Sequence, residues 1–208
     1  MAEIMKQWYE ENPDLLAAEK AALEKMAKDD YKEFGFLKDG RAYWNIGFIS
    51  GLSNRKYTVI LVYPMNHPSK IEIPGIRVYP VEPTYEMIVE EINKASGRSD
   101  GCIPYSMRDC NGNYSLSIVS ADWLRRNNTL ESKQGIISAA TVLLETKRWI
   151  FLYEKSVANH GNGFYNYFSI DRASVNSEKE KQACIDYYSD PAVRFYRENP
   201  VYELEENR

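Results

Sequence analysis

The residues most suited to chemistry occupy one short stretch, DCNGNYSLSIVSADW, which runs from Asp109 to Trp123. Its Asn-Gly-Asn triplet is typical of a turn, and the alternating residues that follow are typical of a strand. Ser115 lies just after the turn, three residues beyond Gly112. A serine hydroxyl acts as a nucleophile only when a base takes its proton and donors stabilise the oxyanion. Ser115 is therefore a candidate nucleophile, a replacement for one, or an ordinary strand residue.

Four other residues could support chemistry at Ser115. His160 is the candidate base, in a segment that we expect to be a loop, and Asp122 flanks the serine segment. Tyr105 and Asn113 lie on its N-terminal side and are candidates for the site because they flank the serine. Three of them have a structural alternative: a surface loop for His160, and turn formation for Tyr105 and Asn113.

The three cysteines offer one rival to the serine. Cys110 lies five residues before Ser115, where Asp109 would disfavour its thiolate and Arg108 would offset that effect. An ordinary exposed thiol is the simpler interpretation. The other two, Cys102 and Cys184, are expected to be packing residues.

Composition excludes several classes of function. The chain has 208 residues, a formal net charge of -4 and a pI near 5.4, which argue against general nucleic-acid binding. No apolar run approaches the roughly 20 residues that span a bilayer, and the N-terminus does not resemble a signal peptide. An odd number of cysteines without metal-ligand spacing favours a reducing cytoplasm, and the two histidines of the chain are too few for a histidine-rich metal site.

Hydrophobic periodicity and turn residues predict an α+β protein with an antiparallel meander of about four strands. A helix begins after the cap Asn12 with Pro13 in its first position, and we expect it to reach residue 33. A second helix carries Met87, Ile88 and Ile92 on one face and stops at Gly97. The remaining predicted elements are a hairpin over 41–50 and 55–64, strands over 69–83 and 114–120, a helix over 128–149, and short helices near the C-terminus.

Three separated fragments, taken in order, resemble the ubiquitin-conjugating enzyme family. YPMNHPSK keeps the proline spacing of that family's signature with Pro64 and Pro68. NGNYSLSIVSADW resembles the acceptor segment, in which a tryptophan lies eight residues after the acceptor cysteine; here Trp123 lies eight after Ser115. NNTLESKQGIISAATVLL resembles the helix that follows.

The resemblance implies one domain over 1–208 with the family's fold. Its core would cover about 8–153, with a helix-bearing insertion over about 72–101 and a C-terminal extension over about 154–208. It also implies that Trp44 stands on the second strand. His67, inside the proline signature, is expected to be structural.

The same resemblance implies an activity and partners. The protein would be a cytoplasmic, bacterial acyl carrier that accepts the C-terminus of a ubiquitin-like protein from an adenylating activating enzyme and passes it to a target protein. The N-terminal helix is where such proteins meet the activating enzyme, and its lysines Lys20, Lys25 and Lys28 could contribute. No metal or cofactor is needed, because the acyl group arrives activated.

Two departures leave the activity open. The family's His-Pro-Asn triplet would fall at Tyr105–Met107 and is absent, and Ser115 stands where the acceptor cysteine is expected. Ser115 could carry the acyl group as an oxyester, or it could be an engineered replacement of cysteine that traps a stable ester. The alternative is a non-catalytic variant that binds ubiquitin-like or activating-enzyme partners as a scaffold.

Overall fold

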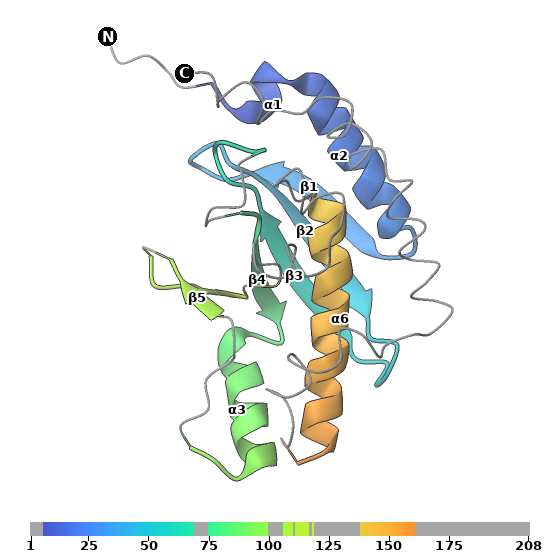
Figure 1. Cartoon of the computed structure of the whole chain (residues 1–208), viewed down its shortest axis with the longest axis vertical. Coiled ribbons are helices and arrows are strands. Elements are labelled where there is room, and N and C mark those ends of the chain that lie inside the picture. The colour runs from blue at the N-terminus through green and yellow to red at the C-terminus, as the bar shows by residue number, and fades with distance from the viewer. Residues whose placement is uncertain are drawn as a thin grey trace, which may run out of the picture.

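The computed structural model describes residues 6–68, 75–99, 106–109, 111–116, 118 and 138–160. Within these residues the chain forms four helices and one antiparallel sheet of six strands (Figure 1). The strands lie in the order β1-β2-β3-β4-β6-β5. The predicted α+β class is confirmed, but the sheet has six strands where about four were expected.

The N-terminal helical region begins as predicted and ends earlier. A short helix α1 (Trp8–Glu11) precedes α2 (Pro13–Met26), whose first turn is capped by the Asn12 side chain accepting from the Leu15 N–H. The prediction that this helix reaches residue 33 is wrong, because Tyr31–Phe36 forms strand β1. The aromatic residues of this strand pair with β2, and this long-range pairing outweighs the local helical pattern.

Four consecutive strands form an antiparallel meander, whose first strand was not predicted. They are β1 (Tyr31–Phe36), β2 (Ala42–Ile49), β3 (Lys56–Val62) and β4 (Arg77–Glu82). A hairpin of β5 (Ser106–Arg108) and β6 (Tyr114–Leu116) extends this sheet, with β6 next to β4 through the Val78–Leu116 pair. Trp44 lies on β2, as expected. The stretch assigned to an insertion contributes β4 to the sheet as well as a helix.

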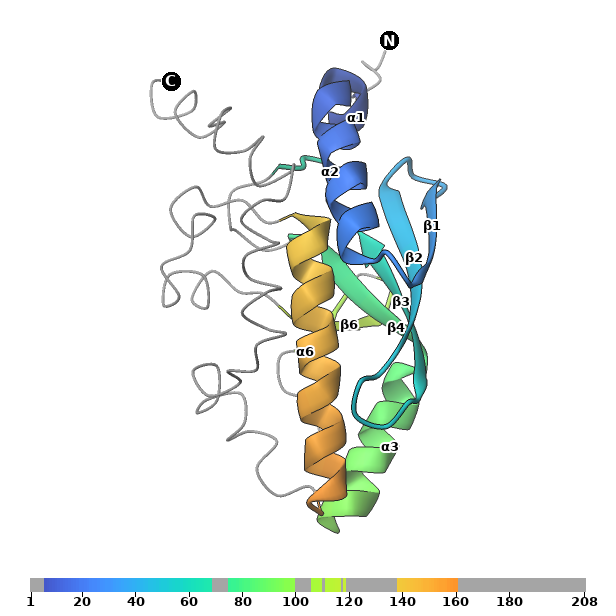
Figure 2. The ribbon, with the colours of Figure 1, turned by 90° about the vertical axis from the view of Figure 1, so that its right-hand side faces the viewer.

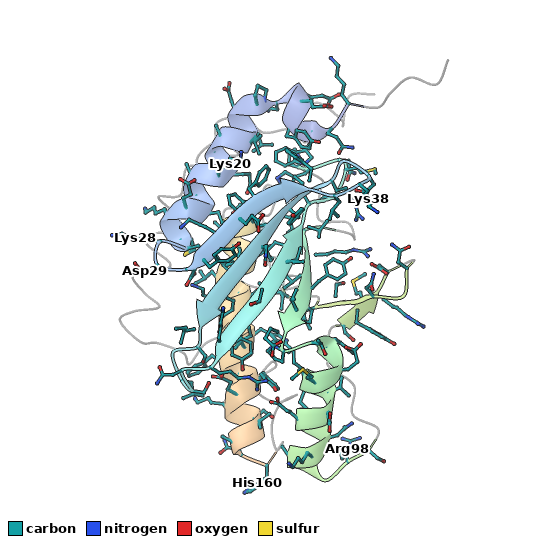
Figure 3. All side chains as sticks on the ribbon, turned by 180° about the vertical axis from the view of Figure 1, so that it is seen from behind. Lys20, Lys28, Asp29, Lys38, Arg98 and His160 are labelled. Carbon is teal, nitrogen blue, oxygen red and sulfur yellow. The ribbon has the colours of Figure 1, made fainter. Side chains whose placement is uncertain are left out.

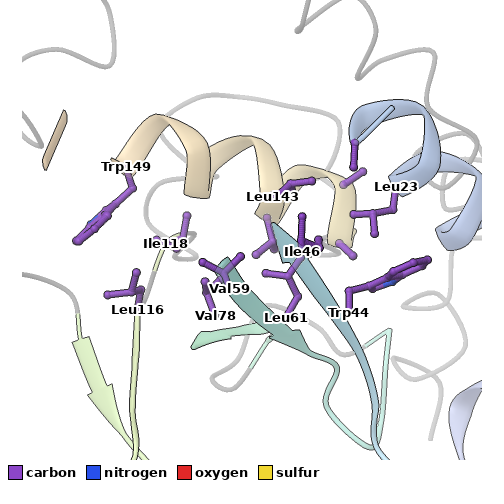
Figure 4. Close-up of a cluster of buried hydrophobic side chains, with 14 of the residues drawn as sticks. Leu23, Trp44, Ile46, Val59, Leu61, Val78, Leu116, Ile118, Leu143 and Trp149 are labelled. Carbon is purple, nitrogen blue, oxygen red and sulfur yellow. The ribbon is translucent and has the colours of Figure 1, made fainter. Parts of the chain in front are cut away.

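The core lies between one face of the sheet and two helices. Figure 2 shows α2 and α6 (Ala139–Ala158) together on this face. Successive side chains of a strand point to opposite faces, so Trp44, Ile46 and Phe48 of β2 all enter the core. Figure 4 shows Leu23 of α2 and Leu143 of α6 directed toward the strand residues Ile46 and Leu61.

Helix α3 (Tyr85–Ser96) follows β4 and packs against α6. The Thr84 side chain caps its first turn, and Gly97 ends it with a positive φ of 67°, as the stop at Gly97 predicted. Ile88 and Ile92 are buried, whereas Met87, expected on the same face, is exposed. Successive residues of a helix differ by 100° in direction, so Met87 points well away from Ile88. The buried stripe of α3 is therefore narrower than predicted.

Helix α6 differs from its prediction at both ends. Ser138 has an extended backbone, with φ -82° and ψ 159°, and its side chain accepts from the Thr141 N–H as the helix cap. A continuous helix over 128–149 is therefore wrong, and its proposed caps at 128 and 129 lie outside the described residues. The helix continues to Ala158, through the first residues of the segment expected to be a loop.

Candidate functional site

Ser115 is buried inside the sheet. It lies in the middle of β6, opposite Met107 of β5, and only 2% of its surface is exposed. Its hydroxyl donates to the Met107 carbonyl oxygen at 3.2 Å. The hydroxyl proton is therefore already engaged by a backbone acceptor, which cannot act as a general base.

The turn before β6 is organised by Asp109. Its carboxylate accepts from the backbone N–H groups of Asn111 and Asn113, at 2.9 and 2.8 Å, and from the Asn113 side chain at 3.3 Å. Desolvation alone would raise the pKa of Asp109, but these hydrogen bonds outweigh it and hold the pKa below its ordinary value. Gly112 supplies the positive φ of 87° that this turn requires. Asn113 thus supports the turn through Asp109.

Aromatic contacts tie the β5–β6 hairpin to α3. The rings of Tyr85 and Tyr114 stack with centroids 4.4 Å apart, and the Arg108 guanidinium lies 5.6 Å from the Tyr114 ring. The Tyr85 hydroxyl also donates to Ser106 Oγ at 3.0 Å. These contacts hold the hairpin that contains Ser115 in a fixed position relative to α3.

His160 lies away from this hairpin. It follows the C-terminal end of α6, with a positive φ of 57°, and its side chain is exposed. Figure 3 places it at the end of the molecule near Arg98, which follows α3, whereas the hairpin lies near the middle. The structure therefore does not bring the candidate base to Ser115. Tyr105, Asp122, Cys110 and Trp123 lie outside the described residues.

A buried carboxylate that the sequence interpretation did not single out joins α2 to two other segments. Glu19 is fully buried, and its Oε2 accepts from the Tyr63 hydroxyl and from the Ala139 N–H, both at 3.0 Å. Its Oε1 lies 3.1 Å from His67 Nε2. The Ala139 N–H is in the first turn of α6, where a carboxylate is favoured by the helix dipole. In the sequence, Glu19 could have been noticed because it lies four residues after Leu15, which places an acidic residue on the apolar face of the helix.

A second buried carboxylate, Glu154 of α6, anchors the turn between β2 and β3. The hydroxyls of Ser50 and Ser53 each donate to it, and the Tyr57 hydroxyl donates at 2.8 Å. Burial is the main cause of a raised Tyr57 pKa, and the hydrogen bond to Glu154 is the second; together they hold this pKa well above its ordinary value. All four side chains act as one network that attaches the strand hairpin to the helix.

Arg55 and Glu91 form a neighbouring cluster that attaches the same hairpin to α3. The Arg55 guanidinium makes a bidentate contact with Glu91, at 2.8 and 2.9 Å, and the Tyr153 hydroxyl also donates to Glu91. The Arg55 hydrogen bonds are the main cause of a lowered Glu91 pKa; partial desolvation opposes them and the Tyr153 hydroxyl assists.

Glu91→Gln tests this cluster through the pH dependence of stability. Because the folded-state pKa of Glu91 is below its ordinary value of 4.5, its charge stabilises the fold above that pH. This contribution is lost as the pH falls through the lowered pKa. We expect the variant to lose about 1 kcal/mol of unfolding free energy at pH 7, a modest value because Glu91 is one-third exposed.

Denaturant titrations of wild type and Glu91→Gln between pH 7 and pH 3 measure this difference. It should shrink below pH 4.5. The matched control is Glu90→Gln, at an exposed position of the same helix, which should stay within about 0.5 kcal/mol of wild type at pH 7. A wild-type advantage that stays constant down to pH 3 would contradict the assignment.

The fold and these networks define a mixed α+β protein in which two helices, α2 and α6, cover one face of an antiparallel sheet. No protein-family model, curated protein or solved structure matches the chain. Within the described part of the chain, no helix is long and apolar enough to cross a membrane, and no group of three or more metal-ligating side chains could hold a metal ion.

Proposed function

We propose that the protein is a non-catalytic variant of the ubiquitin-conjugating type, which binds ubiquitin-like or activating-enzyme partners without a covalent step. The observation that carries this proposal is the state of Ser115, which is buried and donates its hydroxyl proton to the Met107 carbonyl. A nucleophile must reach the carbonyl carbon of its substrate and transfer its proton to a base. Ser115 fulfils neither condition with the described residues around it.

The order of elements supports the ubiquitin-conjugating type. An N-terminal helix, a four-strand meander and a helix across the sheet follow one another as the sequence resemblance implies. The segment with the Ser115 turn lies between the meander and that helix, which is the position of the acceptor segment in the resemblance. Binding in place of catalysis also agrees with the missing His-Pro-Asn triplet.

The proposal is tested by incubating the protein with ATP, an adenylating activating enzyme and the ubiquitin-like protein of that enzyme. Both partner proteins should come from the same organism as this chain. We expect a non-covalent complex and no increase in the intact mass of the protein. Ser115→Ala should bind with a dissociation constant within about twofold of wild type, because a buried side chain makes no contact with the partner.

A covalent adduct would overturn the proposal, and its chemistry identifies the acceptor. A mass increase that survives thiol reductant, is removed by mild hydroxide and is absent in Ser115→Ala would establish an oxyester carrier. An adduct that is lost in reductant and in Cys110→Ala would instead assign the acceptor to that cysteine.

A further inference from the structure

The turn between β5 and β6 contains an asparagine followed by a glycine, Asn111-Gly112. In such a pair the glycine nitrogen can attack the side-chain carbonyl carbon of the asparagine, because glycine has no Cβ to hinder the approach. Asn111 is exposed, and its side chain makes no hydrogen bond within the described part of the chain. The turn lies at the outer end of a hairpin that projects from the sheet (Figure 1), so water and hydroxide reach this side chain.

The hydrogen bonds of the turn restrain this attack. The Gly112 N–H donates to the Asp109 carbonyl oxygen at 3.1 Å, so the attacking nitrogen is already engaged. The Asp109 carboxylate holds the same turn closed by accepting from the N–H groups of Asn111 and Asn113. The turn must therefore open before the Gly112 nitrogen can lose its proton and reach the asparagine side chain.

A second turn of the described chain has the same backbone geometry. Asp39-Gly40 lies in the loop between β1 and β2, and its glycine has a φ of 85°, against 87° for Gly112. The Gly40 N–H also donates to the carbonyl oxygen three residues earlier, that of Leu37, at 2.9 Å. Asp39, like Asn111, is exposed. The two turns therefore differ mainly in the side chain that precedes the glycine.

The side chain of Asp39 is protected where that of Asn111 is not. Its carboxylate accepts from the Arg41 N–H at 3.1 Å and from the Arg41 guanidinium at 2.8 Å. Desolvation alone would raise the pKa of Asp39, but these hydrogen bonds outweigh it and lower the pKa. The side chain is thus an ionised carboxylate held in place, and its negative charge resists a nucleophile. The amide of Asn111 is neutral and unrestrained.

We propose that Asn111 is a site of spontaneous deamidation, and that the Asp109 carboxylate sets its rate by holding the turn closed. Hydroxide removes the proton of the Gly112 nitrogen, which bonds to Asn111 Cγ. The Cγ–Nδ2 bond then breaks, and the side-chain nitrogen takes a proton from water and leaves as ammonia. Water opens the resulting succinimide at Cγ, which gives aspartate, or at the backbone carbonyl carbon, which gives isoaspartate. The reaction needs no partner protein, so it is independent of the proposed binding.

Isoaspartate would disturb the hairpin that contains Ser115. In this product the main chain runs through the side-chain carbons, which lengthens the turn by a methylene group. The longer turn cannot keep the Gly112–Asp109 contact in step with the β5–β6 pairs. Ser115 lies opposite Met107 in those pairs, so its enclosure in the sheet depends on the intact turn.

Peptide mapping of the full chain, incubated at mildly alkaline pH, measures deamidation at each site. Asp109→Ala should deamidate at Asn111 at least about fivefold faster than wild type, the factor expected when a turn loses the stabilisation of one hydrogen bond. Asp109→Asn keeps a side-chain acceptor oxygen, so its rate should lie between the two. Asn162-Gly163, the other Asn-Gly pair of the chain, should keep its wild-type rate in both variants.

Two further measurements complete the test. Asp39 should form no isoaspartate under conditions that convert most of Asn111. In the separated isoaspartate form, residues 106–108 and 114–116 should exchange hydrogen faster than in unmodified protein, while α2 should not change. Asn111→Asp adds the charge without lengthening the main chain, so it should accelerate this exchange less.

The proposal is overturned if Asn111 keeps its amide while Asn162 is converted. It is also overturned if Asp109→Ala leaves the rate at Asn111 unchanged, or if Asp39 forms isoaspartate as fast as Asn111 does. Equal rates in Asp109→Asn and Asp109→Ala would show that the charge of Asp109, and not its hydrogen bonds, restrains the reaction, which would overturn the role assigned to the closed turn.

Discussion

Replacing Glu19 by alanine is expected to destabilise the protein by about 3–5 kcal/mol, the range found when one partner of a buried charged network is removed. The variant would deprive the Tyr63 hydroxyl and the Ala139 N–H of a buried acceptor, and His67 of its neighbouring carboxylate. It would also leave a cavity where α2 meets the start of α6. Urea unfolding followed by circular dichroism measures the change in free energy.

Two variants separate the hydrogen bonds of Glu19 from other effects of substitution. Glu19→Gln keeps the shape and one acceptor oxygen, so it should lose less stability than Glu19→Ala. Glu24→Ala, on the exposed side of the same helix, should stay within about 0.5 kcal/mol of wild type. A loss below about 1 kcal/mol in Glu19→Ala would show that the network does not hold α2 to α6.

Glu154→Ala is expected to have the second largest effect, about 3 kcal/mol, because the carboxylate accepts from three hydroxyl groups in a buried site. The loss of stability should be greatest where the β2–β3 turn is attached to α6. Hydrogen exchange at residues 50–57 should therefore accelerate in the variant more than exchange in α2.

Alkaline titration gives an independent readout of the same network. Burial and the hydrogen bond to Glu154 raise the pKa of Tyr57, so its neutral form stabilises the fold below pH 10 and this contribution is lost as the pH rises above it. Tyrosinate absorbance should thus begin at lower pH in Glu154→Ala than in wild type. An unchanged titration, with unfolding equal to that of the exposed control Glu90→Ala, would contradict the network.

Local signals predicted several elements well. Asn12 and Pro13 marked the start of α2, and Gly97 marked the end of α3. The aromatic and β-branched runs around Trp44 and Val59 predicted the β2–β3 hairpin. These signals succeed because capping, proline geometry and positive φ act within a few residues of the chain.

The errors arose where distant contacts decide the outcome. Tyr31 and Phe34 suit either a strand or the continuation of a helix, and pairing with β2 makes them part of a strand. The apolar residues around Ser138 suggested one long helix, yet its hydroxyl caps a helix that begins there.

The candidate site divides in the same way. The sequence identified the turn, the strand and the position of Ser115, because turn residues and alternation are local properties. It did not indicate that the hydroxyl bonds to Met107, because that contact depends on pairing β6 with β5. Nor did it separate Ser115 from His160, whose place depends on the length and direction of α6.

The sequence by itself determined the α+β class, the principal turns, the start of α2 and the end of α3, because these depend on the preferences of neighbouring residues. Only the tertiary structure decided that Ser115 is enclosed, that Glu19 and Glu154 are buried acceptors, and that β1 is the first strand of the described sheet. The physical reason is that burial and strand pairing are made by segments far apart in the chain. A residue's type limits what it can do, and the segments that fold against it determine what it does.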